Sequence, residues 1–296
     1  ITKSVTSVVV PNTGGLHGLE AAAAAGIVAG DPDKQLLVIS QVTDSQKTEI
    51  AAFLQEKKFR VEESDSGELF DIQITLTGEG HTAQSRICGS HTNVVQINVD
   101  GQTLFSRQIQ TAREEEKSQK ELLTVADIVD FADTVPLEQI KTVLERQIRC
   151  NMAIAEEGIR GNWGANIGSV ILARQGELLA KQAAAYAAAG SDARMSGCEM
   201  PVIILSGSGN QGITASVPVI VYARGMHASN EKLYRALCVS NLVTVHLKEG
   251  IGALSAYCGV VSAGAGAACG VAYLLGGGRR EISHTLPTFL NPPTAL

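Results

Sequence analysis

The segment 206–212, with the sequence S-G-S-G-N-Q-G, concentrates residue types that can bind a small polar molecule, and it lies between the apolar runs 202–205 and 213–222. Its glycines allow positive φ angles and close approach of the backbone to a ligand. Its polar side chains can donate and accept hydrogen bonds. The glycines are Gly207, Gly209 and Gly212, assigned to cofactor binding, and the polar residues are Ser206, Ser208, Asn210 and Gln211, assigned to substrate binding.

The glycine spacing also matches G-x-G-x-x-G, the pattern of dinucleotide-binding loops, with the acidic Glu231 at a suitable distance beyond it. That fold requires a helix to begin at the loop, with its N-terminus facing the pyrophosphate. Pro218 interrupts the next apolar run and is expected to break such a helix after about two turns. No second strand–helix–strand unit follows. An NAD-binding protein therefore stays the lower alternative.

A second polar cluster, G-S-H-T-N, lies in a turn between two expected strands. A histidine beside hydroxyl and amide groups can relay a proton or hold a carboxylate or amine. The alternative is a turn whose side chains cap their own backbone. The candidate catalytic residues here are His91, Ser90, Thr92 and Asn93.

Polar loops also flank an alanine-rich helix that we expect over residues 165–189. Arg194 carries a guanidinium fork suited to a carboxylate. Asn166 and Asp192 are further candidates for substrate binding, although capping of helix ends explains part of the same pattern.

The six cysteines form no C-x-x-C pair, which argues against zinc ribbons and thioredoxin-type sites. We expect Cys258 and Cys269 to share a helix over residues 252–275. Eleven residues of helix separate them by about 16 Å, so at most one can ligate any single metal centre.

Composition limits the class of protein. The net charge is −6, and the lysines and arginines form no stripe, which argues against nucleic acid as a partner. The uncharged run 251–275 consists mainly of Ala, Gly and Ser, so a buried helix is favoured over a membrane span. With no secretory leader visible, the expected location is the cytoplasm.

The expected fold class is α+β. Short strands over 70–77, 82–88, 93–99 and 103–105, with turns between them, predict a mostly antiparallel sheet in an α+β domain of residues 1–112. A charged connector follows over 113–121. Residues 122–296 predict a mainly α-helical domain that carries the glycine-rich loop. Strand-like sequence also occurs at 59–62 and 202–205, and Pro287 begins an expected irregular tail.

Five ordered motifs together resemble the L-cysteine desulfidase family, which is related to the α chain of iron–sulfur L-serine dehydratases. They are V-V-V-P-N-T-G-G-L-H-G-L from Val8, G-S-H-T-N-V-V from Gly89, N-M-A-I-A-E-E-G-I-R-G-N-W-G from Asn151, S-D-A-R-M-S-G from Ser191 and S-G-S-G-N-Q-G-I-T-A from Ser206. The resemblance extends over nearly the whole chain.

The resemblance implies a lyase that uses a four-iron cluster and no pyridoxal phosphate. Its reaction is β-elimination from L-cysteine or L-serine, bound between the two domains, giving pyruvate, ammonia and sulfide or water. Cys258 matches one cluster ligand, whereas the two other cysteine segments of the family are absent here. The chain is thus either a fragment of a longer enzyme, which we favour, or a cluster-free relative that binds amino acids or has a structural role. A homodimer is compatible with either.

Overall fold

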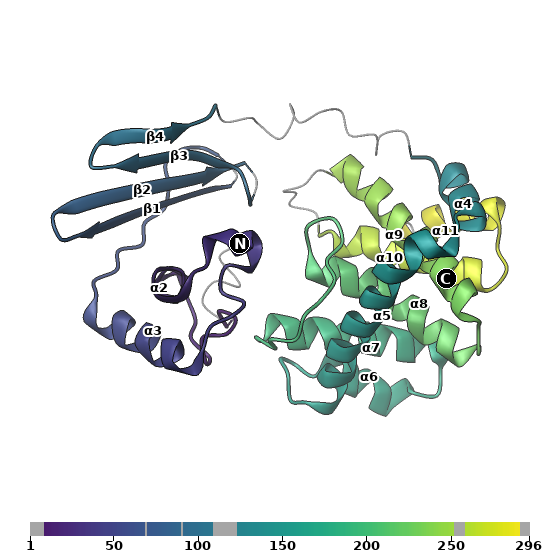
Figure 1. Cartoon of the computed structure of the whole chain (residues 1–296). Helices are drawn as coiled ribbons and strands as arrows, with labels where there is room; N and C mark the ends of the chain where they lie inside the picture. The colour runs from purple at the N-terminus through teal and green to yellow at the C-terminus, as the bar shows by residue number, and fades with distance from the viewer. Residues whose placement is uncertain (1–8, 69, 90, 109–122, 252–257, 291–296) are drawn as a thin grey trace. The chain divides into compact units, whose positions relative to one another are not determined.

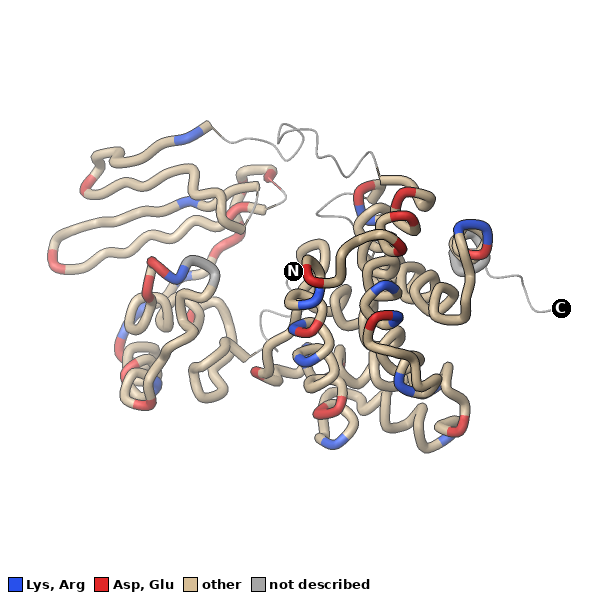
Figure 2. The backbone as a smooth tube through the Cα atoms, turned by 45° about the vertical axis from the view of Figure 1, so that its right-hand side comes forward, with Lys and Arg blue, Asp and Glu red and all other residues tan. Residues whose placement is uncertain are grey.

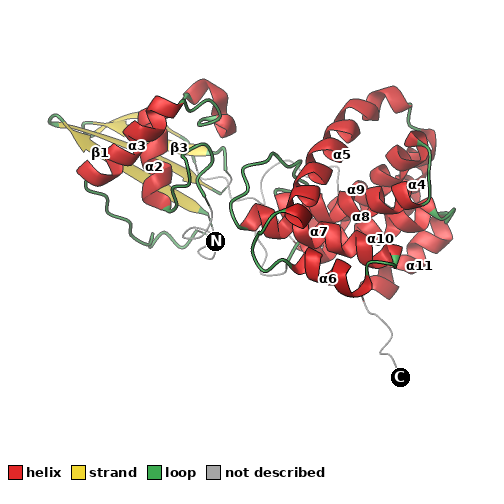
Figure 3. Cartoon of the chain, turned by 90° about the horizontal axis from the view of Figure 1, so that it is seen from below, coloured by secondary structure: helices red, strands yellow, loops and turns green. Residues whose placement is uncertain are grey.

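The computed structural model describes residues 9–68, 70–89, 91–108, 123–251 and 258–290. The chain divides into two compact units, one over Val10–Ser118 and one formed by Ile1–Val9 with Gln119–Leu296. All described strands of the sheet belong to the first unit, and the second is helical (Figure 3). The α+β fold class is therefore confirmed.

The first unit begins with helices α2 (Leu19–Ala29) and α3 (Asp44–Glu56), joined by the 3-10 helix η1 (Pro32–Leu37). Thr43 caps α3 in a capping box with Gln46, which satisfies two backbone N–H groups at the helix start. Ile50 of α3 is fully buried and forms a small core with Ala24 and Ala25 of α2.

The sheet is a four-stranded antiparallel meander in the order β1-β2-β3-β4 (Figure 1). Its strands are β1 (Asp71–Gly78), β2 (His81–Cys88), β3 (Val94–Val99) and β4 (Gln102–Ser106). Asp100 and Gly101 have φ angles of 50° and 79°, as a two-residue hairpin turn between β3 and β4 requires. The four strands are as expected to within about two residues, whereas residues 59–62 form no strand.

An ion pair joins the first two strands. Arg86 donates from Nε and Nη2 to the two carboxylate oxygens of Asp71, each at 2.9 Å. The Asp71 side chain is only 2% exposed. The bidentate hydrogen bonds from Arg86 hold the pKa of this carboxyl well below its usual range.

The second unit is a bundle of helices arranged around α8 (Figure 1). Its helices are α4 (Val125–Thr134), α5 (Leu137–Arg160), α6 (Ile167–Gln175), α7 (Leu179–Met195), α8 (Gly209–Gly225), α9 (Asn230–Ile251), α10 (Val260–Leu274) and α11 (Arg279–Leu290). Helix α8 packs against α5, α7, α9 and α10. Eleven of its seventeen residues are buried, so it is the central helix of this unit.

The expectation that Pro218 breaks a helix after the glycine-rich segment is wrong, because Pro218 lies inside α8. An interior proline loses one backbone hydrogen bond and costs about 3 kcal/mol. The buried faces of α8 offset that cost, since Ile213, Val217 and Ile220 are fully buried among four neighbouring helices. The apolar run 202–205, in turn, forms no strand and ends in an isolated bridge from Leu205 to Ser208.

Small residues let the helices of this unit pack closely. A Cβ atom at Gly158 of α5 would overlap with the backbone of Ala189 in α7, and one at Gly266 of α10 would overlap with Thr244 of α9. This agrees with the high glycine and alanine content, which predicts closely packed helices.

Three further expectations for this unit are corrected. The helix expected over 165–189 is two helices, α6 and α7, separated at Gly176. Helix α10 begins at Val260, so Cys258 does not share a helix with Cys269. Pro287 lies within α11 rather than in an irregular tail.

Two results concern the broad class of partner. Lysines and arginines alternate with aspartates and glutamates along both units, and no basic stripe is visible among the described residues (Figure 2). Within the same part of the chain, no helix is long and apolar enough to cross a membrane.

Candidate functional site

The polar segment of the sequence forms a tight turn that leads into α8. Leu205 and Ser208 exchange two backbone hydrogen bonds of 3.1 Å each. The two residues between them, Ser206 and Gly207, have φ angles of 46° and 80°. Glycine adopts that conformation freely, whereas it is strained for serine. The turn directs the chain into the first residue of α8, Gly209.

Ser208 is the N-cap of α8, and its hydroxyl oxygen accepts from the backbone N–H of Gln211 at 3.5 Å. The other two glycines of the segment permit close contacts within the protein. A Cβ atom at Gly209 would overlap with the guanidinium of Arg194, and one at Gly212 would overlap with the carbonyl of Ile203. Arg194 therefore lies directly against the first turn of α8.

Arg194 is half-buried near the end of α7, and its Nη1 donates to Asn210 Oδ1 at 3.2 Å. Burial lowers the pKa of its guanidinium, although an arginine stays charged. No carboxylate among the described residues forms an ion pair with it. The start of α8 adds partial positive charge from its unpaired N–H groups. The two together can bind an anion.

Gln211, the third residue of α8, contributes a buried hydrogen-bond acceptor in the first turn of that helix. The residue is 5% exposed, and its Oε1 has no partner among the described residues. Its side-chain amide lies against Gly259, where a Cβ atom would overlap with it. The neighbouring Cys258 is exposed. The structure thus gathers the glycine-rich segment, Arg194 and the Cys258–Gly259 turn.

Sequence reasoning missed Asn151 as a residue of this site. Asn151 is fully buried on α5, accepts from Ile203 N at 2.8 Å, and donates to Ile203 O at 3.3 Å and to Ser216 Oγ at 2.9 Å. These bonds fix the segment before the turn against α8. Asn151 opens one of the five family motifs, and that position is the only signal for it in the sequence.

Asn166 and Asp192 have structural partners at the start of α6. Asp192 Oδ2 accepts from the backbone N–H of Ile167 at 2.9 Å, and so satisfies one N–H group of that helix. Asn166 has a φ of 54° and accepts from the backbone N–H of Trp163 at 3.2 Å. Helix capping, the alternative to substrate binding, therefore accounts for the Asp192 contact, whereas the Asn166 side chain bonds within the turn of residues 162–166 and makes no cap hydrogen bond.

The second polar cluster lies between β2 and β3, in the unit of residues 10–118. Asn93 donates from Nδ2 to the backbone carbonyl of Cys88 at 2.9 Å, which closes the turn. The ring of His91 lies 4.6 Å from that of Phe70. Thr92 is exposed in the same turn. Ser90 lies outside the described residues.

No group of three or more His, Cys, Asp or Glu side chains that could hold a metal ion occurs among the described residues. Burial raises the pKa of the Cys238 thiol to about 11 and that of Cys269 to about 12. Burial therefore favours the neutral thiol of both residues at neutral pH. Cys258 is the exposed cysteine of this unit.

Comparison with known proteins gives a family match. The family model described as serine dehydratase alpha chain matches residues 33–292. The chain is 52% identical over 286 residues to UPF0597 protein DSY1109 of Desulfitobacterium hafniense, covering 97% of this chain and 66% of that protein. It is 41% identical over 286 residues to a UPF0597 protein of Lachnoclostridium phytofermentans, covering 97% and 68% respectively. It thus spans about two thirds of the length of these relatives. No solved structure matches the chain.

Proposed function

Because the chain belongs to the serine dehydratase alpha chain family, we propose that it is a lyase acting on L-cysteine or L-serine. The reaction is elimination of the β-substituent, as sulfide or water, followed by hydrolysis of the resulting aminoacrylate to pyruvate and ammonia. The specific assignment as an L-cysteine desulfidase rests on the five motifs quoted above.

The observation that carries the proposal is the half-buried Arg194 at the N-terminus of α8, which forms no ion pair with any described carboxylate. A guanidinium fork matches the geometry of a carboxylate, and a helix N-terminus favours the same negative charge. Asn210 accepts from Arg194 and orients its guanidinium. In the proposal, Arg194 and the capped start of α8 bind the α-carboxylate of the substrate.

The acceptor on Gln211 supports an amino acid rather than a simple carboxylate as the ligand. An unsatisfied buried acceptor costs about 1–3 kcal/mol. The ammonium group of an α-amino acid is a donor that can satisfy Gln211 Oε1 while the carboxylate is bound by Arg194. Asn151 acts as a positioning residue, because it holds the segment that precedes the turn.

Elimination also requires removal of the α-proton, and His91 is the residue that we assign to proton transfer. Imidazole is the side chain best suited to accepting a proton near neutral pH. Ser90, Thr92 and Asn93 remain proposed neighbours of that step.

For the cofactor, we propose a four-iron cluster with Cys258 as one ligand and no pyridoxal phosphate. Such a cluster supplies Lewis acidity towards the leaving group. The described residues offer one exposed thiol at this site and no complete set of ligands.

Because the described residues offer no complete set of cluster ligands, a second candidate is a cluster-free relative that binds amino acids without catalysis. The dinucleotide alternative lacks a parallel sheet among the described residues, where the sheet is antiparallel. It predicts thermal stabilisation by NAD, whereas we expect none.

The test is anaerobic reconstitution of a full-length preparation of the protein with iron and sulfide, followed by assays of bound iron and of pyruvate, ammonia and sulfide formed from L-cysteine and L-serine. The lyase proposal predicts iron uptake and pyruvate, both lost in Cys258→Ser and retained in the control Cys150→Ser. A protein that binds L-serine but takes up no iron and forms no pyruvate would establish the cluster-free alternative instead.

A further inference from the structure

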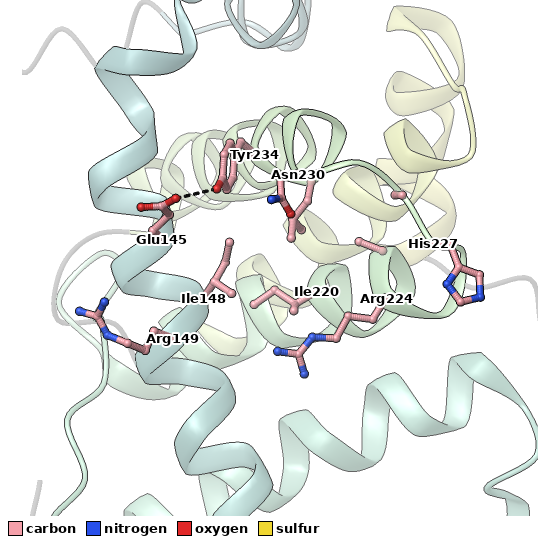
Figure 4. A pocket seen from close by; sticks show the side chains of 11 residues that line it. Glu145, Ile148, Arg149, Ile220, Arg224, His227, Asn230 and Tyr234 are labelled. Atoms are coloured by element: carbon pink, nitrogen blue, oxygen red, sulfur yellow. Dashed lines mark hydrogen bonds between the residues drawn. The ribbon is translucent and has the colours of Figure 1, made fainter.

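A pocket of about 310 Å³ lies near the C-terminal end of α8, between α5, α8 and α9 (Figure 4). Ile220, Ala223 and Arg224 of α8 line it, whereas the glycine-rich turn precedes the first residue of the same helix. A helix of this length extends about 25 Å, so this pocket is distinct from the Arg194 site. Its volume suits a metabolite rather than a nucleotide cofactor.

The floor of the pocket is apolar. Ile148 of α5 and Ile220 of α8 point towards each other across its centre, and Leu233 of α9 also lines it (Figure 4). These side chains come from three helices that pack together in the core of the unit. The floor is therefore preformed, and it matches a small aliphatic group.

The rim of the pocket carries opposite charges on two sides. Glu145 and Tyr234 lie on one side, where the Tyr234 hydroxyl donates to Glu145 Oε1 at 2.9 Å. Arg149 and Arg224 lie on the other side (Figure 4). Arg224 forms an exposed ion pair with Glu156, and such pairs are weak enough to rearrange for a ligand.

Glu145 and Arg149 are one helical turn apart on α5, at the i, i+4 spacing that favours an ion pair. They do not form one. Glu145 is held by Tyr234 instead, and Arg149 forms no ion pair with any described residue. The carboxylate of Glu145 and the guanidinium of Arg149 therefore lie on the rim without pairing to each other, one helical turn apart on α5.

From this arrangement we propose that the pocket binds an α-amino acid with an aliphatic side chain, at a second site separate from the proposed lyase site. Arg149 and Arg224 bind the ligand's carboxylate, and Glu145 accepts from its ammonium group. The side chain of the ligand lies over Ile148, Ile220 and Leu233. Because one end of α8 lines this pocket and the other carries the glycine-rich turn, the ligand contacts the central helix of the unit.

The experiment is calorimetric titration of the chain with L-leucine, with 4-methylpentanoate, which lacks the ammonium group, and with 3-methylbutylamine, which lacks the carboxylate. L-Leucine is expected to bind, and each analogue at least about 10-fold more weakly, because each leaves one charged partner unmatched. Absence of L-leucine binding up to about 10 mM, well above the millimolar affinity that so small a site allows, would overturn the proposal.

Variants locate the binding. Arg149→Gln and Glu145→Gln are each expected to weaken L-leucine binding about 10-fold or more. Both residues are exposed, so the fold tolerates the changes, and thermal melting checks this. Arg146→Gln changes an exposed arginine on the same helix outside the pocket and is expected to leave binding unchanged.

Arg194→Gln is also expected to leave L-leucine binding unchanged, which separates this site from the proposed lyase site. Binding that survives Arg149→Gln, or that is lost in Arg194→Gln, would contradict the assignment to the pocket. The inference does not rest on the proposed lyase function, and either can fail alone.

Discussion

Replacement of Asn151 by alanine tests whether a buried hydrogen-bond network holds the segment before the glycine-rich turn. Asn151 satisfies both the N–H and the carbonyl of Ile203, which have no other role in a strand or helix. Ser216 keeps a second bond, to Gly212 O at 2.7 Å, and so remains partly satisfied. Two groups therefore lose their partner, at about 1.5 kcal/mol each, for a total of about 3 kcal/mol.

For a unit of this size, about 3 kcal/mol corresponds to a fall in Tm of roughly 6–12 °C. Thermal melting followed by circular dichroism measures it, and hydrogen exchange at the Ile203 amide should become faster. The matched control is Ser216→Ala, which removes one of Asn151's three bonds and is expected to cost about 1 kcal/mol. An Asn151→Ala protein that melts within about 2 °C of wild type, or a costlier Ser216→Ala, would refute the reasoning.

Three further predictions concern packing, charge and thiol reactivity. Gly212→Ala places a methyl group against a backbone carbonyl and should lower the free energy of unfolding by about 3 kcal/mol, whereas Gly250→Ala, which meets nothing within 4 Å, should not destabilise the protein in the same urea titration. Asp71→Asn should cost about 2 kcal/mol at pH 7. Because the pKa of Asp71 is depressed by its arginine partner, that cost should shrink as the pH falls below about 4, and a pH-independent cost in urea unfolding would contradict the assignment. Iodoacetamide at pH 8 should label the exposed Cys258 and spare Cys269, whose pKa burial raises to about 12; mass spectrometry showing equal labelling would contradict this.

The sheet could be predicted from the sequence because its signals are local. Alternating strands and the Asp100–Gly101 turn fix a meander whose strands neighbour each other in sequence. Helix α8 could not be predicted in the same way, since the local effect of Pro218 is to break a helix. Burial against four helices, of which α5 and α10 are distant in sequence, decides its structure, and a single sequence does not reveal that packing.

The residues of the candidate site also fall into those with a local signal in the sequence and those without one. The polar residues of 206–212 stand out by residue type, and the guanidinium fork of Arg194 suggests the same ligand chemistry. The structure brings Arg194 into contact with Asn210. Asn151 was missed because its partners lie 52 and 65 residues away, and a buried helical asparagine has no local signature. The roles of Gly209 and Gly212 were likewise hidden, because the atoms that fill their missing Cβ positions come from other segments.

The central claim is that Arg194 and the N-terminus of α8 bind the carboxylate of an α-amino acid. Calorimetric titration with L-serine and with L-serinamide, which lacks the carboxylate, on wild type and Arg194→Gln tests it most directly. The account predicts that L-serine binds wild type and that L-serinamide binds at least about 10-fold more weakly. It also predicts that Arg194→Gln weakens L-serine binding by at least about 10-fold. Equal binding of the two ligands to wild type, or undiminished binding of L-serine to Arg194→Gln, would contradict it.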